Sequence, residues 1–192
     1  MIKLLTAILF TISISAYAVP SVPAQDAFFD ALRQHCGKAF SGRIVVDNAP
    51  SDAFHNKPMV MHVRKCSDTT LWIPFHVGGD RSRTWVITKT GSGLSLKHDH
   101  RHQDGSEDSL TQYGGHTTDA GWPQVQSFPA DSYSKQLFVD SGIPQSMGNT
   151  WQMYIYPTSF TYRMVREGRE FRVDFDLTNP VDTPPAPWGY ED

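Results

Sequence analysis

Residues 150–177, which read TWQMYIYPTSFTYRMVREGREFRVDFDL, decide the fold class. Apolar side chains alternate with polar ones in three consecutive runs of this stretch, which are Trp151/Met153/Ile155, Phe160/Tyr162/Met164 and Phe171/Val173/Phe175/Leu177. Successive side chains of a strand point to opposite faces of a sheet, so each run predicts a strand with one buried face. Gly168 lies between the last two runs, where a tight hairpin is expected. The stretch therefore predicts an antiparallel meander.

The same period of two begins at Gly42 and continues through five earlier runs, at 43–46, 59–66, 70–77, 83–90 and 94–102. Residues 103–129 are less regular, with short strands expected near 111–113 and 125–128. About eight to nine antiparallel strands with one apolar face are typical of a small closed barrel that can hold one small ligand. We therefore expect a mainly β protein with a single antiparallel up-and-down barrel. A β-sandwich is the alternative.

Two short helices are expected beside the strands. Residues 25–40 place four side chains at helical spacing, namely Phe28, Phe29, Leu32 and Cys36. This spacing predicts an amphipathic helix at the start of the domain. A second helix is expected to begin at Asp131 or Ser132 and to end before Gly142.

The two ends of the chain differ from the middle in composition. Lys3, the apolar run 4–14 and the sequence Ala16-Tyr17-Ala18 predict a signal peptide that spans residues 1–18. Residues 19–179 are expected to form the single barrel domain, and residues 180–192 a Pro-rich, poorly ordered tail. No later segment is apolar and long enough to predict a transmembrane helix. The protein is therefore expected to be exported, to a periplasm or out of the cell.

Cysteine content and charge narrow the range of functions further. Cys36 and Cys66 both follow the predicted signal peptide, and an even count in an oxidising compartment predicts one disulfide between them. The formal net charge is -3 with neutral histidines. A chain without a basic field is not expected to bind nucleic acid or an anionic membrane.

The most informative pattern for function lies in residues 94–102. Leu94, Leu96, His98, His100 and His102 fall on one face of the predicted strand, so the imidazoles continue the apolar face. This pattern predicts a small-molecule site inside the barrel, with these three histidines at its polar end. Its apolar lining is expected to include Leu94, Leu96, Phe75, Met153 and Phe175.

A metal-dependent enzyme of the zinc type is the first alternative. Imidazoles two residues apart on a strand have Cα atoms about 6.6 Å apart and can converge on one divalent ion. The candidate ligands are His98, His100, His102 and Glu107, with Glu107 or Asp108 as a base. A polar barrel mouth, in which the histidines bond to water and to nearby carboxylates, explains the same residues without a metal.

Other routes to function are less well supported. The chain contains no Gly-x-Ser-x-Gly elbow and no His-Glu-x-x-His motif, so no catalytic residue is assigned. Four arginines, Arg64, Arg81, Arg83 and Arg101, could meet an anionic ligand or form ordinary surface ion pairs. A structural or interaction protein of the envelope, which would present Trp72, Trp85 and the tail to a partner, is the third hypothesis.

Two resemblances add to these expectations. The stretches 73–78 (IPFHVG), 80–85 (DRSRTW), 96–106 (LKHDHRHQDGS) and 113–115 (YGG) resemble a family of uncharacterised exported bacterial proteins, which implies export. The order of signal peptide, helix, Gly42 and meander resembles a calycin, the lipocalin-like β-barrel. Ile44 stands where lipocalins carry their signature tryptophan, and the second predicted helix precedes the last three strands. That resemblance therefore concerns architecture and implies no binding residues.

Overall fold

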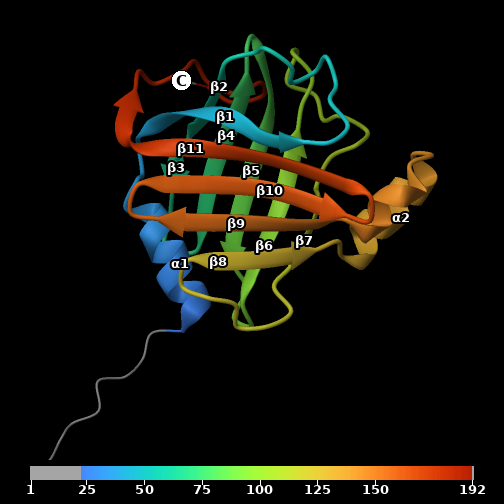
Figure 1. Cartoon of the computed structure of the whole chain (residues 1–192), viewed down its shortest axis with the longest axis horizontal. Coiled ribbons are helices and arrows are strands. Elements are labelled where there is room, and N and C mark those ends of the chain that lie inside the picture. The colour runs from blue at the N-terminus through green and yellow to red at the C-terminus, as the bar shows by residue number, and fades with distance from the viewer. Residues whose placement is uncertain (1–22, 192) are drawn as a thin grey trace, which may run out of the picture.

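The computed structural model describes residues 23–191 (Figure 1). The predicted signal peptide, residues 1–18, lies outside the described residues. The helices are α1 (Ala24–Arg33), α2 (Ser132–Asp140) and the short 3-10 helix η1 (Pro144–Gly148). The strands are β1 (Ala39–Asp47), β2 (Met59–His62), β3 (Lys65–Cys66), β4 (Thr70–Val77), β5 (Asp80–Lys89), β6 (Leu94–His100), β7 (Tyr113–His116), β8 (Val125–Pro129), β9 (Thr150–Tyr156), β10 (Ser159–Arg166) and β11 (Arg169–Val181).

The strands form one antiparallel sheet that curls into a nearly closed barrel. Their order is β7-β6-β5-β4-β2-β1-β11-β10-β9-β8, with β3 paired to β4. The first long strand, β1, pairs with the last, β11, so the meander closes on itself there. The ends of the sheet, β7 and β8, meet through the isolated bridge between Gly115 and Ala130. The predicted antiparallel barrel, compatible with a calycin-like architecture, is thus confirmed.

The expected number of eight to nine strands is wrong, because the sheet contains eleven. The predicted run 59–66 is divided into β2 and β3, with Val63 and Arg64 between them. In addition, both short strands expected in the irregular stretch 103–129 form, β8 at the expected position and β7 two to three residues later than expected. At Gly114 and Gly115 a Cβ atom would overlap the carbonyl oxygens of Leu96 and Pro129. Glycine therefore permits the close backbone approach at this edge of the sheet, which a hydrophobic period cannot reveal.

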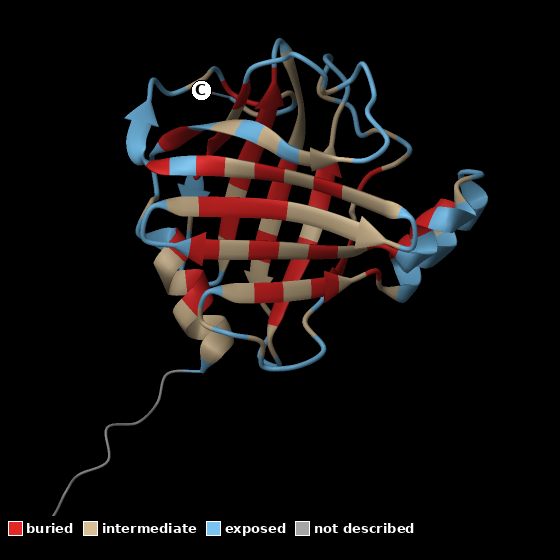
Figure 2. Ribbon diagram, in the orientation of Figure 1, coloured by how far each residue is buried: buried red, intermediate tan, exposed pale blue. Residues whose placement is uncertain are grey.

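The two ends of the barrel are covered differently. Helix α1 buries Phe28, Phe29 and Leu32 completely at one end. Helix α2 lies at the opposite end of strands β9 to β11, as Figure 1 shows. Buried and less buried residues alternate along β9 and along the first part of β11 in Figure 2, as the period of two predicts, whereas β10 buries the three consecutive residues Phe160, Thr161 and Tyr162.

A disulfide joins the segment after α1 to the sheet. Cys36 and Cys66 are bonded, with Cα atoms 6.3 Å apart, which confirms the predicted bridge. The bridge connects the residues that follow α1 with β3. Among residues 23–191, no helix is long and apolar enough to cross a membrane.

The C-terminal segment, residues 182–191, differs from the expected disordered tail because it packs on the outer face of the barrel. The Trp188 N–H donates to the Arg81 carbonyl oxygen at 3.0 Å, and Arg81 Nη1 donates to the Ala186 carbonyl oxygen at 3.0 Å. The Tyr190 hydroxyl donates to Asp99 Oδ2 at 2.5 Å. These partners lie far away in sequence, so composition alone could not indicate that the segment docks.

Candidate ligand-binding site

A cavity of about 210 Å³ lies inside the barrel at the end covered by α2 and η1. Its wall combines β4 to β6, β9 to β11, the loop 48–58 and the segment that contains α2 and η1. The lining residues are Phe54, Phe75, Arg83, Trp85, His98, His100, Leu110, Tyr113, Phe138, Ile143, Ser146, Asn149, Trp151, Tyr162, Met164, Arg169 and Phe171. Pockets for drug-sized ligands measure about 300–1,000 Å³, so this cavity suits a smaller molecule.

Strand register explains why the wall changes from apolar to polar toward this end. Leu71, Ile87 and Leu96 lie opposite one another on β4, β5 and β6, and all three are fully buried. The next inward positions toward the cavity, two residues further along each strand, are Ile73, Trp85 and His98. The inward positions after these are Phe75, Arg83 and His100. The polar groups are therefore concentrated in the last inward positions of β5 and β6.

Two groups of stacked rings line the cavity. The Trp85 ring is nearly parallel to two neighbouring rings, Phe75 at 4.9 Å with an interplanar angle of 19° and Tyr162 at 4.5 Å with an angle of 14°. His98 stacks on Tyr113 at 4.5 Å with an angle of 14°. Nearly parallel rings on both β4–β5 and β6–β7 make flat apolar walls.

Hydrogen bonds determine the proton positions on His98. Its Nδ1 lies 3.1 Å from the Tyr113 carbonyl oxygen, which can only accept, so Nδ1 carries the hydrogen. Burial, followed by the proximity of His100, lowers the pKa of His98 to about 3. The neutral ring therefore accepts at Nε2 from the Tyr162 hydroxyl, 2.9 Å away. Both nitrogens of His98 are thus satisfied within the barrel.

His100, the last residue of β6, lines the cavity two residues beyond His98. Its Nε2 lies 3.2 Å from the Tyr113 hydroxyl. Burial, followed by the nearby Arg83, lowers the pKa of His100 to about 4, and burial raises the pKa of Tyr113 to about 12. An efficient general base or acid has a pKa near the working pH. At neutral pH these groups are suited to hydrogen bonding and poorly suited to proton transfer.

The charged groups that line the cavity are both cations. Arg83 Nη1 donates to Asp80 Oδ2 at 2.5 Å, and the guanidinium lies 5.1 Å from the Phe54 ring. Arg169 Nη1 pairs with Asp47 Oδ1 at 2.7 Å. Within the described part of the chain, no aspartate or glutamate lines the cavity. The described lining therefore offers guanidinium groups, and no carboxylates, to a molecule inside the cavity.

The predicted ligand-binding residues fall into three places. Phe75, His98 and His100 line the cavity. Four others, Leu94, Leu96, Met153 and Phe175, are buried in the core but do not line the cavity. His102 lies beyond the end of β6 and is exposed, and its N–H donates to the Ser106 carbonyl oxygen at 2.8 Å. Strand β6 ends at His100, Arg101 keeps only an isolated bridge to Glu107, and the chain turns at residues 103–104, so the alternation of faces does not reach His102.

The predicted metal ligands are not brought together. His98 Nε2 bonds to Tyr162, His102 lies outside the barrel, and Glu107 Oε1 accepts from Arg101 Nη2 at 3.3 Å. Across residues 23–191, no three His, Cys, Asp or Glu side chains are grouped so that they could hold a metal ion.

Several lining residues were not predicted as site residues. Tyr162 and Trp151 belong to the alternating runs of β9 and β10, so their inward direction could have been inferred from parity. Trp85, which the third hypothesis placed on a partner surface, is 1% exposed and lies inside the barrel. Arg169 follows the last hairpin and has no signal in the hydrophobic pattern.

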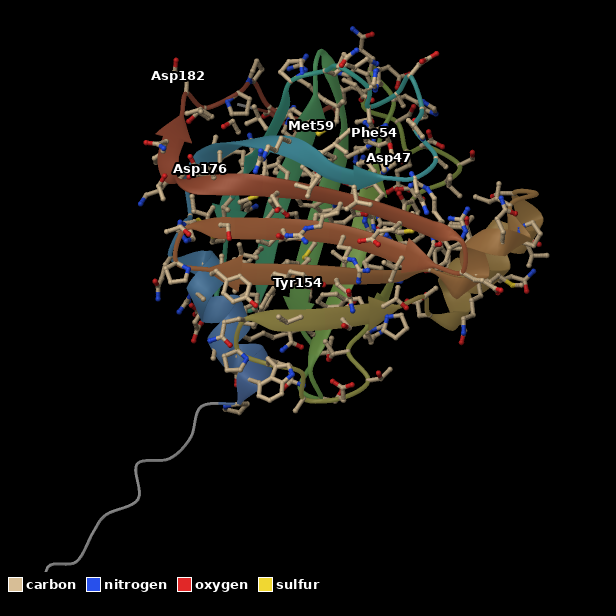
Figure 3. All side chains as sticks on the ribbon, in the orientation of Figure 1. Asp47, Phe54, Met59, Tyr154, Asp176 and Asp182 are labelled. Atoms are coloured by element: carbon tan, nitrogen blue, oxygen red, sulfur yellow. A yellow bond between two sulfur atoms is a disulfide. The ribbon has the colours of Figure 1, made fainter. Side chains whose placement is uncertain are left out.

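The loop 48–58 contributes one side chain to the cavity, Phe54. Its ring lies 4.9 Å from Phe171 and 6.4 Å from Phe75. Phe54 also lines an outer groove of about 480 Å³ together with Asp47 and Met59. Figure 3 shows Asp47 and Phe54 near each other where β1 ends. Phe54 thus separates the cavity from the outer groove.

No family model, curated protein or solved structure matches the chain. The geometry of the cavity is therefore the basis on which a function can be argued.

Proposed function

We propose that the chain is an exported β-barrel protein that binds a small molecule in the cavity beside His98 and His100. The observation that carries this proposal is an internal cavity lined by stacked rings with a few convergent polar groups, which is how small-molecule sites are usually built. The polar groups are two histidine–tyrosine pairs whose histidines are neutral at pH 7.

Binding fits this chemistry better than catalysis. The pKa values of His98 and His100 are lowered to about 3 and about 4, so neither is a strong base. Tyr162 donates to His98, and its own pKa is raised well above the usual value by burial. These groups can orient a ligand through hydrogen bonds and need not exchange protons with it.

Three observations support export. The Cys36–Cys66 disulfide is a bond that persists in oxidising compartments and is rare in the cytosol. The predicted signal peptide and the resemblance to exported bacterial proteins lead to the same compartment. An exported binder would meet its ligand outside the cytoplasm and hold it within the barrel.

The ligand is proposed to reach the cavity past Phe54. This residue belongs to the loop 48–58, and it lines both the cavity and the groove on its outer side. Loops move more readily than paired strands, so displacement of Phe54 requires no break in the sheet.

Native mass spectrometry of protein recovered from the exported fraction tests the proposal. We expect a bound small molecule in the wild type and its loss in Met164→Trp, because Met164 lines the cavity and a larger ring would fill it. Met147→Trp is the matched control, since Met147 is 39% exposed and does not line the cavity.

Equal ligand content in the two variants would contradict the proposal. So would a wild type that carries no ligand and whose fluorescence, from the lining residues Trp85 and Trp151, responds to no small aromatic probe.

A further inference from the structure

We infer that the cavity selects a small planar carboxylate, with its ring against the stacked aromatic walls and its carboxylate on the Arg83 guanidinium. This inference rests on the proposed binding function and specifies the chemical class of the ligand.

The charge of the cavity is the first argument. Its described lining includes Arg83 and Arg169 but no acidic side chain. Asp80 and Asp47, which pair with these arginines, do not line the cavity. An anion placed inside could therefore contact a guanidinium directly, whereas a cationic ligand would find no carboxylate in the described lining to contact and would be disfavoured.

Arg83 is held in place before any ligand arrives. Asp80 Oδ2 accepts from Arg83 Nη1 at 2.5 Å, and Asp80 Oδ1 accepts from the Ser82 N–H at 2.9 Å. The side chain of Arg83 also lies over the Phe54 ring. In the described chain Asp80 is the hydrogen-bonding partner of this guanidinium, so other N–H groups of Arg83 remain for a ligand. A planar guanidinium with two free N–H groups matches the two oxygens of a carboxylate.

The remaining polar groups are less suited to this role. Arg169 Nη1 is already engaged by Asp47, by Asn48 Oδ1 and by the Glu170 carbonyl oxygen. His98 is neutral and both of its nitrogens are occupied by Tyr113 and Tyr162. His100 can offer a hydrogen bond but carries no charge at neutral pH. The negative charge of the ligand is therefore expected to pair with the Arg83 guanidinium.

Size and shape restrict the rest of the ligand. The cavity measures about 210 Å³, and its walls are the Phe75/Trp85/Tyr162 stack and the His98/Tyr113 stack. Flat walls favour a flat ligand that can extend the stacks. A single aromatic ring that bears one carboxylate satisfies both restrictions.

The first test compares three probes of nearly equal shape on the wild-type protein by isothermal titration calorimetry at pH 7.5. The probes are benzoate, its neutral analogue benzamide, and the cation benzylammonium. A hydrogen bond to a charged group contributes about 1.5–3 kcal/mol, which is ~10- to 100-fold in affinity. We expect benzoate to bind more tightly than benzamide by about this factor, and benzylammonium to bind weakest.

The second test changes the arginine. Arg83→Gln should remove the preference for benzoate and leave the affinity for benzamide within ~2-fold of the wild type. Arg163→Gln is the control, because Arg163 does not line the cavity and pairs with Glu170 at 2.8 Å. This control variant should keep the full preference. If Arg83→Gln does not fold, the comparison of probes on the wild type decides by itself.

The outcomes separate the two proposals. Equal binding of benzoate and benzamide would overturn the carboxylate inference while the binding function stands. A preference for benzoate that persists in Arg83→Gln would overturn the assignment of the carboxylate to Arg83. Absence of binding by all three probes at concentrations on the order of 10 mM, together with no co-purifying molecule, would overturn both.

Discussion

The inner and outer faces of strands β4 to β6 bury polar side chains in opposite ways. Inside the barrel, His98 is 2% exposed and both of its ring nitrogens have partners in Tyr113 and Tyr162. On the outer face His76 is 5% exposed, yet neither of its ring nitrogens has a partner in the described chain. The inner His98 is thus fully hydrogen-bonded within the barrel, whereas the outer His76 is buried without a hydrogen-bond partner in the described chain.

The C-terminal segment accounts for this difference. His76 lines a small hollow with Pro184 and Pro185, and Asp99 is covered where Tyr190 bonds to it. The C-terminal segment therefore shields these outer-face residues from water, and it is attached to the barrel by a few hydrogen bonds. The inner face is removed from water by the whole barrel. We expect the inner face to resist change and the outer face to depend on this segment.

The largest expected effect concerns the inner face. Trp85→Ala should lower the free energy of unfolding by about 3–5 kcal/mol, because it removes a fully packed aromatic ring from the core. Trp72 lies half-buried on the outer face beside Lys65, so Trp72→Ala should lower the free energy of unfolding much less. Urea unfolding followed by circular dichroism measures both. Similar losses for the two variants would contradict the distinction between the faces.

The next effect concerns the contact that holds the C-terminal segment. Tyr190→Phe removes the hydrogen bond to Asp99 and should cost about 1.5–3 kcal/mol in the free energy of unfolding. Hydrogen exchange should become faster in β4 to β6 and remain unchanged in β9 to β11. Tyr156→Phe, at an exposed position, is the control. Uniform acceleration across the barrel would show that the segment supports both faces equally.

A pH effect of intermediate size should come from His76. Burial is the main cause that lowers its pKa to about 4 in the folded state, from 6.5 when unfolded. Protonation then favours the unfolded chain, so this contribution to stability is full above pH 6.5 and falls as the pH drops toward 4. Between pH 7 and 5.5 this histidine alone should account for a loss of about 1 kcal/mol.

The variant His76→Leu tests this assignment. Its free energy of unfolding should decline less than that of the wild type over the same pH range. His55→Leu, at an exposed loop position, should decline as the wild type does. An unchanged pH dependence in His76→Leu would remove His76 as the source.

The smallest expected change in stability concerns His102, which lies just beyond the end of β6, and it is compared with His100, which lines the cavity. His102→Ala should change the free energy of unfolding by less than about 0.5 kcal/mol, since His102 is exposed, and it should leave probe binding unchanged. His100→Ala should weaken probe binding because His100 lines the cavity. Calorimetric titration of both variants with benzoate measures the contrast. Equal weakening would mean that the site extends beyond the end of β6.

The barrel could be predicted from sequence where side-chain alternation is regular. Strand β9 and the middle of β11 alternate regularly, β10 keeps Phe160 and Tyr162 on the inner face although Thr161 between them is buried as well, and the inward positions of β4 to β6 follow the same rule. Strand β7 escapes that rule because Tyr113-Gly114-Gly115-His116 has no apolar alternation, and its pairing depends on the missing Cβ atoms. The sheet therefore contains more strands than its hydrophobic period indicates.

The cavity could be predicted only in part for a related reason. The alternation of side chains along a strand predicts that Phe75, His98 and His100 face inward, and all three line the cavity. This alternation is a local property of each strand. Arg169 comes from a hairpin, and Phe54 from a loop that bends over the barrel, so their positions depend on tertiary packing. The C-terminal segment is similar, since Tyr190 and its partner Asp99 are 91 residues apart.

The most direct measurement of the central claim is a titration of isotopically labelled protein with benzoate, followed by backbone and aromatic NMR shifts. We predict saturable chemical-shift changes concentrated at the cavity-lining residues Trp85, His98 and Tyr113. The chemical shifts of His76 and Asp99, on the outer face of the barrel, should stay unchanged. Shifts confined to the outer face, or no saturable shifts at all, would contradict the assignment of the ligand site to the barrel interior.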